Sequence, residues 1–135
     1  MCKRAASRPR PARYPTREEV RHIIHAQMTI SRNRLRLEME GHAGYAEEGR
    51  DIVCAAASSL VSTLMLALSA QMGGGSDIYF DDPRAGPMVL DCGPQEDDME
   101  AARLIYRTIA CGLEALAYRY PDNVEFQLTE DIEKR

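Results

Sequence analysis

One cysteine and one histidine lie near each other in the sequence, together with two polar side chains that could assist them. Asp51 precedes Cys54 by three residues, Ser58 follows it by four, and His42 lies twelve residues upstream. Residues three and four apart share a face of a helix, so Asp51, Cys54 and Ser58 would converge there. A thiol with an imidazole beside it suits nucleophilic catalysis, in which Cys54 is the nucleophile and His42 is the general base and later the general acid.

The segment that would position the thiol is an uncharged run from Ile52 to Ala70 without proline or glycine. Its alanine and leucine content predicts a helix of about five turns, with Asp51 as the N-cap and Cys54 in the first turn. Partial positive charge at a helix N-terminus favours a thiolate and can lower a thiol pKa from about 8.5 into the range of about 3.5 to 7.5. We expect the backbone amides of Cys54 and Ala55 to bind an oxyanion.

Two of these side chains have alternative roles. Asp51 could act only as a helix cap or could face His42, and a carboxylate close to the sulfur would oppose thiolate formation. Ser58 could form a hydrogen bond within the site or donate to the Cys54 carbonyl one turn earlier.

His42 lies in a loop that contains Gly41, Gly44 and Gly49. Glycine tolerates backbone conformations closed to other residues, so these three positions could be hinges. We interpret the loop as a lid that brings His42 to the thiol when substrate binds. The glycines would also suit an inert turn.

This region resembles the signature of a known family. The residues GHA at 41–43, Gly49, DIVCAA at 51–56 and Ser58 are similar to the signature of the ribosomal-processing cysteine protease family, Prp. The resemblance extends from Met28 to about Leu128. Outside the signature it depends on the order of the secondary-structure elements. Ala57 stands where the family more often has valine, a difference that concerns packing rather than chemistry.

The resemblance implies a homodimeric cysteine endopeptidase that forms an acyl-enzyme. Its implied substrate is the precursor of the large-subunit ribosomal protein numbered twenty-seven, from which it removes an N-terminal extension. Three alternatives remain: a protease acting on a phage or other host protein, a non-catalytic dimeric module that binds ribosomal protein or RNA, and a thiol redox sensor centred on Cys54.

Composition indicates one domain in a reducing compartment. The chain has 135 residues, 44% of them hydrophobic, and a net charge of −4. Its four cysteines, at positions 2, 54, 92 and 111, form no CxxC pair and have no metal-ligand spacing. We therefore expect a cytoplasmic protein without metal or cofactor, in which Cys92 and Cys111 are packed and inert.

Residues 1–27 differ in composition from the rest. They contain three prolines and seven Lys/Arg against two Glu, a net charge of +5, whereas the remainder carries −9. We predict a disordered basic extension without a signal peptide. It is either an arm that contacts ribosomal RNA or translated sequence upstream of a start at Met28, and we favour the second. The protease domain would then span 28–130, followed by a charged tail at 131–135.

The remaining pattern predicts the order β-β-α-β-β-α-β. We expect a hairpin from Met28 with a reversal at Asn33–Arg34, strands at 77–80 and 87–91, an amphipathic helix ending before Pro121 and a strand over 124–128. The fold class is α/β (α+β), a two-layer sandwich with a mixed sheet of about five strands and two main helices. The 52–70 helix has too many hydroxyls for a membrane span. Because it is apolar on nearly all sides, we expect the sheet to cover one side of it and a partner subunit to cover the other.

Overall fold

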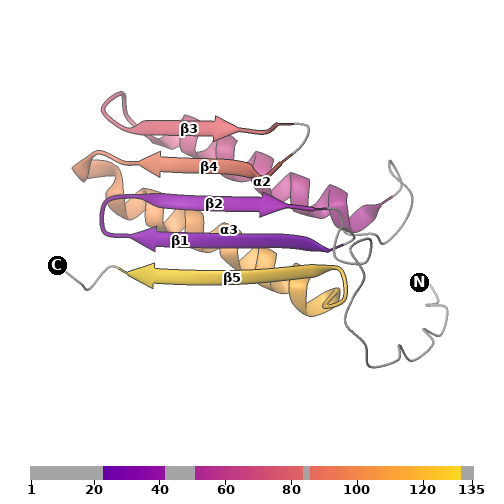
Figure 1. The fold of residues 1–135 in the computed structure, drawn as a ribbon. Helices are drawn as coiled ribbons and strands as arrows, with labels where there is room; N and C mark the ends of the chain where they lie inside the picture. The colour runs from indigo at the N-terminus through magenta and orange to yellow at the C-terminus, as the bar shows by residue number, and fades with distance from the viewer. Residues whose placement is uncertain (1–22, 42–50, 84–85, 132–135) are drawn as a thin grey trace, which may run out of the picture.

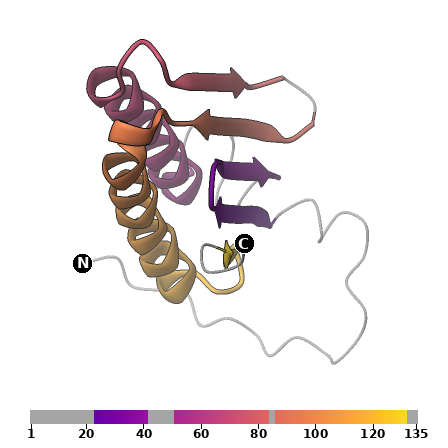
Figure 2. The same ribbon diagram turned by 90° about the vertical axis from the view of Figure 1, so that its left-hand side faces the viewer.

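The computed structural model describes residues 23–41, 51–83 and 86–131, which form a five-stranded sheet with both long helices on one face (Figures 1 and 2). The strands lie in the order β3-β4-β2-β1-β5. The predicted fold class and element order are confirmed, with one added 3-10 turn. The elements are β1 (Ile24–Ser31), β2 (Leu35–Glu40), α2 (Ile52–Gln71), β3 (Asp77–Asp81), β4 (Met88–Gly93), η1 (Glu96–Asp98), α3 (Met99–Arg119) and β5 (Val124–Asp131).

The first two strands form the predicted antiparallel hairpin. The Ser31 amide and hydroxyl both donate to the Arg34 carbonyl, at 2.9 and 2.8 Å, which closes the turn between the strands. β1 also pairs with β5, in parallel, so the sheet is mixed as predicted. The last strand therefore lies beside the first, a pairing between distant segments that the sequence did not indicate.

The first strand begins four residues before the predicted start of the domain at Met28. β1 begins at Ile24, so residues 24–27 belong to the sheet rather than to a basic extension that ends at residue 27. Ile24 and Ala26 are 2% and 4% exposed. Together with Met28 they form the row of alternate β1 side chains that face the core. Basic and polar neighbours concealed this alternation in the sequence. Met28 lies in the middle of the strand, and β5 likewise ends at Asp131, one residue beyond the predicted domain boundary.

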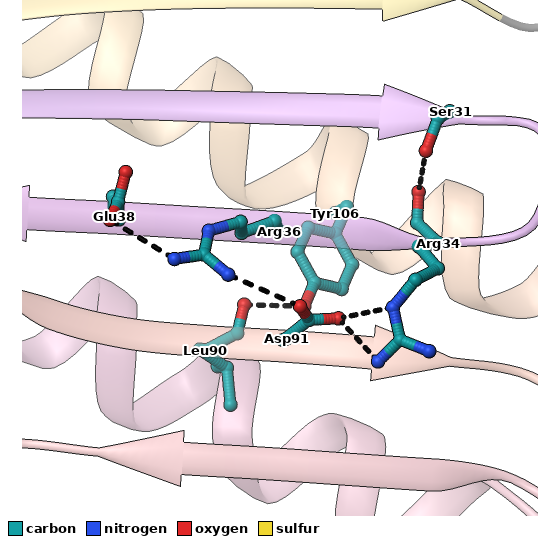
Figure 3. Close-up of polar contacts among 7 residues, drawn as sticks. All are labelled: Ser31, Arg34, Arg36, Glu38, Leu90, Asp91 and Tyr106. Atoms are coloured by element: carbon teal, nitrogen blue, oxygen red, sulfur yellow. Dashed lines mark hydrogen bonds and ion pairs between the residues drawn. The ribbon is translucent and has the colours of Figure 1, made fainter.

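The core lies between the sheet and the two helices. α2 and α3 each bury one row of residues against it: Val53, Ala57, Val61, Leu64 and Leu68 in α2, and Ala102, Tyr106, Ile109, Ala110 and Leu113 in α3. The helices approach each other closely at Gly112, where an added Cβ would lie 2.6 Å from Leu60 Cδ2. Tyr106 is a buried member of the α3 row. Its hydroxyl donates to the Leu90 carbonyl at 3.0 Å (Figure 3), and burial raises the pKa of the phenol.

The outer side of α2 remains exposed in the single chain. Ile52 is 55% exposed and Leu66 is 64% exposed. By length and composition alone, α2 is also apolar enough to cross a membrane. The sheet covers one side of this helix, as expected. We predicted that a partner subunit covers the other side of α2. The described residues of this chain do not cover it.

The opposite face of the sheet is polar. Asp91 in β4 accepts from Arg34 at 3.0 Å and from Arg36 at 3.4 Å, and Arg36 also pairs with Glu38 at 3.1 Å (Figure 3). A mainly antiparallel sheet that is covered on one side has this division between an apolar and a polar face.

A group of hydrogen bonds joins the end of α2 to the starts of β3 and α3. Asp98 Oδ2 accepts from the Gly73 amide at 2.7 Å and from the Ser76 hydroxyl at 2.8 Å, and the same hydroxyl accepts from the Gln95 amide at 2.8 Å. The bonds from Gly73 and Ser76 lower the pKa of Asp98. α2 ends at Gln71 with Met72 as its C-cap, and the glycines that follow lead directly into this junction.

Two cysteines outside the predicted site have different environments. Cys92 is fully buried, and burial raises the pKa of its thiol to about 11, in agreement with a packed and inert side chain. Cys111 is exposed on α3, so the prediction that it is packed was wrong. The core-facing row of α3 passes through Ile109, Ala110 and Leu113, which leaves position 111 on the other side of the helix.

Candidate active site

Asp51 caps the helix that carries Cys54. Its Oδ1 accepts hydrogen bonds from the backbone amides of Val53 and Cys54, both at 3.0 Å. This confirms the predicted N-cap and places Cys54 at the third position of α2, where the unpaired amides of a helix concentrate positive potential. The side chain of Cys54 is half-buried. The thiol therefore lies in the first turn, partly withdrawn from solvent but still accessible.

The same hydrogen bonds correct the prediction for the oxyanion site. The Cys54 amide donates to Asp51 Oδ1, and the Ala55 amide donates to the Asp51 carbonyl at 3.0 Å as the first regular bond of the helix. Neither donor is available to a substrate oxygen in this arrangement. The two predictions are incompatible, because the Cys54 amide that donates to the capping carboxylate of Asp51 cannot also donate to an oxyanion.

Cys54 and Ser58 line a groove of about 570 Å³ beside the start of α2. Four parts of the chain form it: the start of β1, the end of β2 with Gly41, the first three turns of α2, and the described residues around the β3–β4 connection. Its lining residues are Ile24, Met39, Glu40, Gly41, Cys54, Ala57, Ser58, Val61, Ser62, Phe80, Asp82, Pro83, Gly86 and Met88. The groove is large enough to hold several side chains of a peptide.

The walls of the groove combine apolar and acidic side chains. Met39, Phe80 and Met88 supply apolar surface, whereas Glu40 and Asp82 are the charged residues among the described lining. The sequence alone does not identify these wall residues, because strand pairing, rather than proximity in sequence, brings them to Cys54.

Gly41 is the described residue of the predicted loop that lies at the groove. Its φ is +92°, and an added Cβ would overlap the carbonyl oxygen of Ile23, so this position requires glycine. The other loop residues of the predicted site, His42, Gly44 and Gly49, lie outside the described residues. The structure thus places Cys54, Asp51, Ser58 and Gly41 in one region and leaves the position of His42 untested.

Ser58 is exposed and lines the groove one turn after Cys54. Other hydroxyls on the same helix have a different arrangement: Thr63 donates to the Ser59 carbonyl at 2.7 Å and Ser69 to the Met65 carbonyl at 2.9 Å. Ala57, which differs from the residue more usual in the family signature, is 1% exposed and packs with Ile24, Val53 and Val124. Its effect is therefore on packing beneath the site.

Comparison with known proteins identifies the family. The pattern that describes the cysteine protease Prp matches residues 23–125. The chain belongs to the Prp family. The start of the match at residue 23 agrees with the start of β1 near Ile24 and confirms that the domain begins before Met28. Prp family members are cysteine peptidases, so this chain is a cysteine-type peptidase.

Individual Prp relatives agree with this assignment. The ribosomal processing cysteine proteases Prp of two Staphylococcus aureus strains are 30% identical over 86 residues, which cover 64% of this chain and 78% of theirs. The solved S. aureus Prp with a covalently linked product peptide has a TM-score of 0.64 and 26% identity, and it covers 79% of this chain and 100% of its own. A Streptococcus mutans protein has a TM-score of 0.63 and 28% identity, covering 81% and 96%.

Proposed function

We propose that this Prp family member is an endopeptidase in which Cys54 is the nucleophile and His42 is the base. The observation that carries the proposal is the location of Cys54. It is half-buried in the first turn of α2 and lines a groove of about 570 Å³. Gly41 lines the same groove, and His42 directly follows it in the sequence. This adjacency supports His42 as the base in the proposal.

In this mechanism His42 removes the thiol proton and the sulfur attacks the carbonyl carbon of the scissile bond. The tetrahedral intermediate collapses as the carbon–nitrogen bond breaks and His42 donates its proton to the leaving amine. Water, deprotonated by His42, then hydrolyses the thioester and releases the second product. Asp51 stabilises the helix turn that holds Cys54, and the donors to the oxyanion are groups other than the Cys54 and Ala55 amides, which are already engaged.

We propose as substrate the cytoplasmic precursor of the large-subunit ribosomal protein numbered twenty-seven, from which the enzyme removes an N-terminal extension. Two observations on relatives support this: the S. aureus relatives are named ribosomal processing proteases, and S. aureus Prp has been solved with a substrate peptide and with a covalently linked product peptide. The solved protein with substrate peptide is 25% identical to this chain, with a TM-score of 0.60.

The proposal is tested by incubating the full chain with the precursor protein and identifying products by mass spectrometry. We expect wild type to release one N-terminal peptide, and Cys54→Ser and His42→Ala to release none while keeping the wild-type circular dichroism spectrum. Ser59→Ala, an exposed substitution on the same helix, is the matched control. Cleavage by Cys54→Ser would contradict the assigned nucleophile, and cleavage of a phage or other host protein but not of the precursor would contradict the assigned substrate.

We also propose that the enzyme is a homodimer formed through the outer side of its helical layer. α2 and α3 lie on the same face of the sheet (Figure 2), and both expose large apolar side chains: Ile52, Leu66, Leu104 and Tyr118. Covering such residues with the same surface of a second copy would remove them from water. Leu66 is 64% exposed and lies in a helix with no charged residue, which makes it a sensitive position for a test.

The dimer is tested by light scattering after size exclusion. We expect the wild type to have the mass of two chains and Leu66→Asp to shift toward one, because a carboxylate in an apolar interface carries a large desolvation penalty. Thr129→Asp, on the polar face of the sheet, should remain dimeric. A monomeric wild type, or a dimeric Leu66→Asp, would contradict this surface.

A further inference from the structure

β3 (Asp77–Asp81) is an edge strand whose side chains are all exposed. It pairs on one side with β4 and lies at the end of the strand order, so its outer backbone edge has no neighbouring strand among the described residues (Figure 1). Ile78, Tyr79 and Phe80 are 36%, 58% and 39% exposed. Unpaired amides and carbonyls on such an edge can pair with another extended segment.

The edge leads into the groove that contains Cys54. Phe80, the fourth residue of β3, lines that groove, and so do Asp82 and Pro83 directly after the strand. The C-terminal end of β3 therefore lies at the groove that Cys54 also lines. A segment paired with β3 would lead toward this groove.

Charge on this edge selects among possible partners. Residues 77–83 contain three carboxylates, at Asp77, Asp81 and Asp82, and no lysine or arginine. Arg34 and Arg36, on the neighbouring open face, are paired with Asp91 and Glu38 (Figure 3). Arg84 follows this segment and lies outside the described residues. The described edge is therefore acidic.

The same carboxylates disfavour a second copy of β3 as the partner. In an antiparallel pair centred on Tyr79, Asp77 of each strand would face Asp81 of the other, and like charges directly opposite are destabilising. The edge also lacks proline and lysine, which commonly protect exposed edges. An extended segment with positive charge satisfies the backbone and the carboxylates together.

We propose that β3 is the docking strand for substrate and that it binds an extended peptide in which basic and apolar residues alternate. The register gives the pattern. Ile78 and Phe80 pair with Cys92 and Leu90, whose side chains are buried on the helix side, whereas Tyr79 pairs with Asp91 on the open face. Asp77 and Asp81 therefore share the open face with Tyr79. Basic residues of the peptide lie beside these carboxylates, and its apolar residues lie beside Ile78 and Phe80.

The other edge of the sheet provides an internal comparison. β5 is also an edge strand with mostly exposed residues, but β4, β2 and β1 separate it from β3. None of its residues lines the groove of Cys54. Pairing along β5 would carry a peptide away from the thiol, so the proposal predicts docking at β3 and not at β5.

The proposal is tested by binding in the full-length Cys54→Ser protein, which cannot form the acyl-enzyme. The probe is a pool of fluorescein-labelled nonapeptides with Lys or Arg at odd positions and Val, Leu or Phe at even positions. Control pools replace the basic residues with Asp or Glu, or place all basic residues before all apolar ones. We expect the alternating basic pool to bind most tightly by fluorescence polarisation and to slow amide exchange in Asp77–Asp81 by about tenfold.

Charge variants separate this edge from general acidity. The double variant Asp77→Asn with Asp81→Asn should weaken binding of the alternating basic pool by about fivefold, a change typical of two exposed charge pairs. The matched control, Asp131→Asn with Glu125→Gln, removes two carboxylates from β5 and should leave binding unchanged. Thermal unfolding of each variant shows whether it remains folded.

The proposal rests on the proposed peptidase function, but the two fail separately. Binding at β3 without hydrolysis by the wild type would sink the peptidase mechanism and leave the docking strand intact. Hydrolysis with unchanged amide exchange in residues 77–81, slowed exchange at β5, no binding of the alternating basic pool, or equal binding of the acidic pool would each overturn the docking strand.

Discussion

Asp51 has two effects on Cys54 that oppose each other. Its carboxylate organises the first turn of α2 by accepting from the amides of Val53 and Cys54. Its negative charge, held at the backbone of the nucleophile, also disfavours a thiolate. The cap and the charge can be separated, because asparagine keeps a side-chain acceptor at this position and carries no charge.

We predict that Asp51→Asn and Asp51→Ala have different effects. Asp51→Ala removes the cap and should lower the free energy of unfolding by about 1 kcal/mol, whereas Asp51→Asn should lower it by clearly less. Removal of the charge should make Cys54 of Asp51→Asn react faster with iodoacetamide than wild type at a pH below the thiol pKa. Urea unfolding and alkylation rates measure the two effects, and equal destabilisation by both substitutions would contradict the capping role.

At this scale the sequence was informative where chemistry is local. A helix without charge and an aspartate before it were sufficient to predict the N-cap and the position of Cys54. The oxyanion donors could not be predicted in the same way, because the Cys54 amide has one hydrogen and Asp51 Oδ1 already accepts it. Cys111 was misplaced for a different reason: free cysteines are usually buried, but the core-facing row of α3 leaves position 111 on the exposed side of the helix.

At the scale of elements, Asp98 connects α2, β3 and α3. The hydrogen bonds from Gly73 and Ser76 favour its ionised form and lower its pKa in the folded protein. A carboxylate with a lowered folded-state pKa stabilises the fold above its unfolded pKa, near 3.8, and this contribution is lost as pH falls through the folded-state pKa. The junction is therefore weakened by acid.

We predict that Asp98→Ala lowers stability at neutral pH and flattens the loss of stability below pH 4. The wild type should lose the Asp98 contribution on acidification, whereas the variant has already lost it, so their urea midpoints should converge as pH falls. Asp97→Ala, at the neighbouring exposed residue of η1, is the control and should follow the wild type. A constant difference between Asp98→Ala and wild type from pH 7 to pH 3 would contradict the ionised junction.

The order of elements was predictable because hydrophobic period changes clearly between strands and helices. Strand order was not, since every strand with one buried face presents the same alternation whatever its neighbour. The parallel pairing of β1 with β5 joins residues separated by about a hundred positions, for example Ile24 with Val124. No local signal specifies that pairing.

At the scale of the whole molecule, the sheet has one covered face and one polar face, and β1 lies between β2 and β5. β1 therefore contributes to two ladders and to the core, through Ile24, Ala26, Met28 and Ile30. A chain that started at Met28 would lose the first half of this strand, which contradicts the sequence-based preference for that start.

We predict that deleting residues 1–22 leaves a folded protein and deleting residues 1–27 does not. The longer deletion removes Ile24, which is 2% exposed, and loss of a buried isoleucine side chain alone costs about 2 to 5 kcal/mol. It also removes backbone pairing to both neighbouring strands. Circular dichroism and thermal unfolding compare the two deletions, and a longer deletion as stable as the shorter one would restore Met28 as the start of the domain.

The groove also belongs to this scale. The family signature predicted Cys54, Asp51 and Ser58, which lie within eight residues of one another, and Gly41 a short distance before them. The wall formed by Phe80, Asp82 and Met88 depends on β4 pairing with both β3 and β2. Tertiary pairing was therefore needed to relate the acidic edge of β3 to the nucleophile.

The central claim is that Cys54 is a nucleophile activated by His42. The most direct measurement is the alkylation rate of each cysteine against pH, by mass spectrometry, in wild type and His42→Ala with precursor peptide present. We predict fast modification of Cys54 below about pH 7 in wild type, loss of that reactivity in the variant, and slow modification of buried Cys92 in both. A Cys54 profile that resembles an ordinary thiol and does not change in His42→Ala would contradict it.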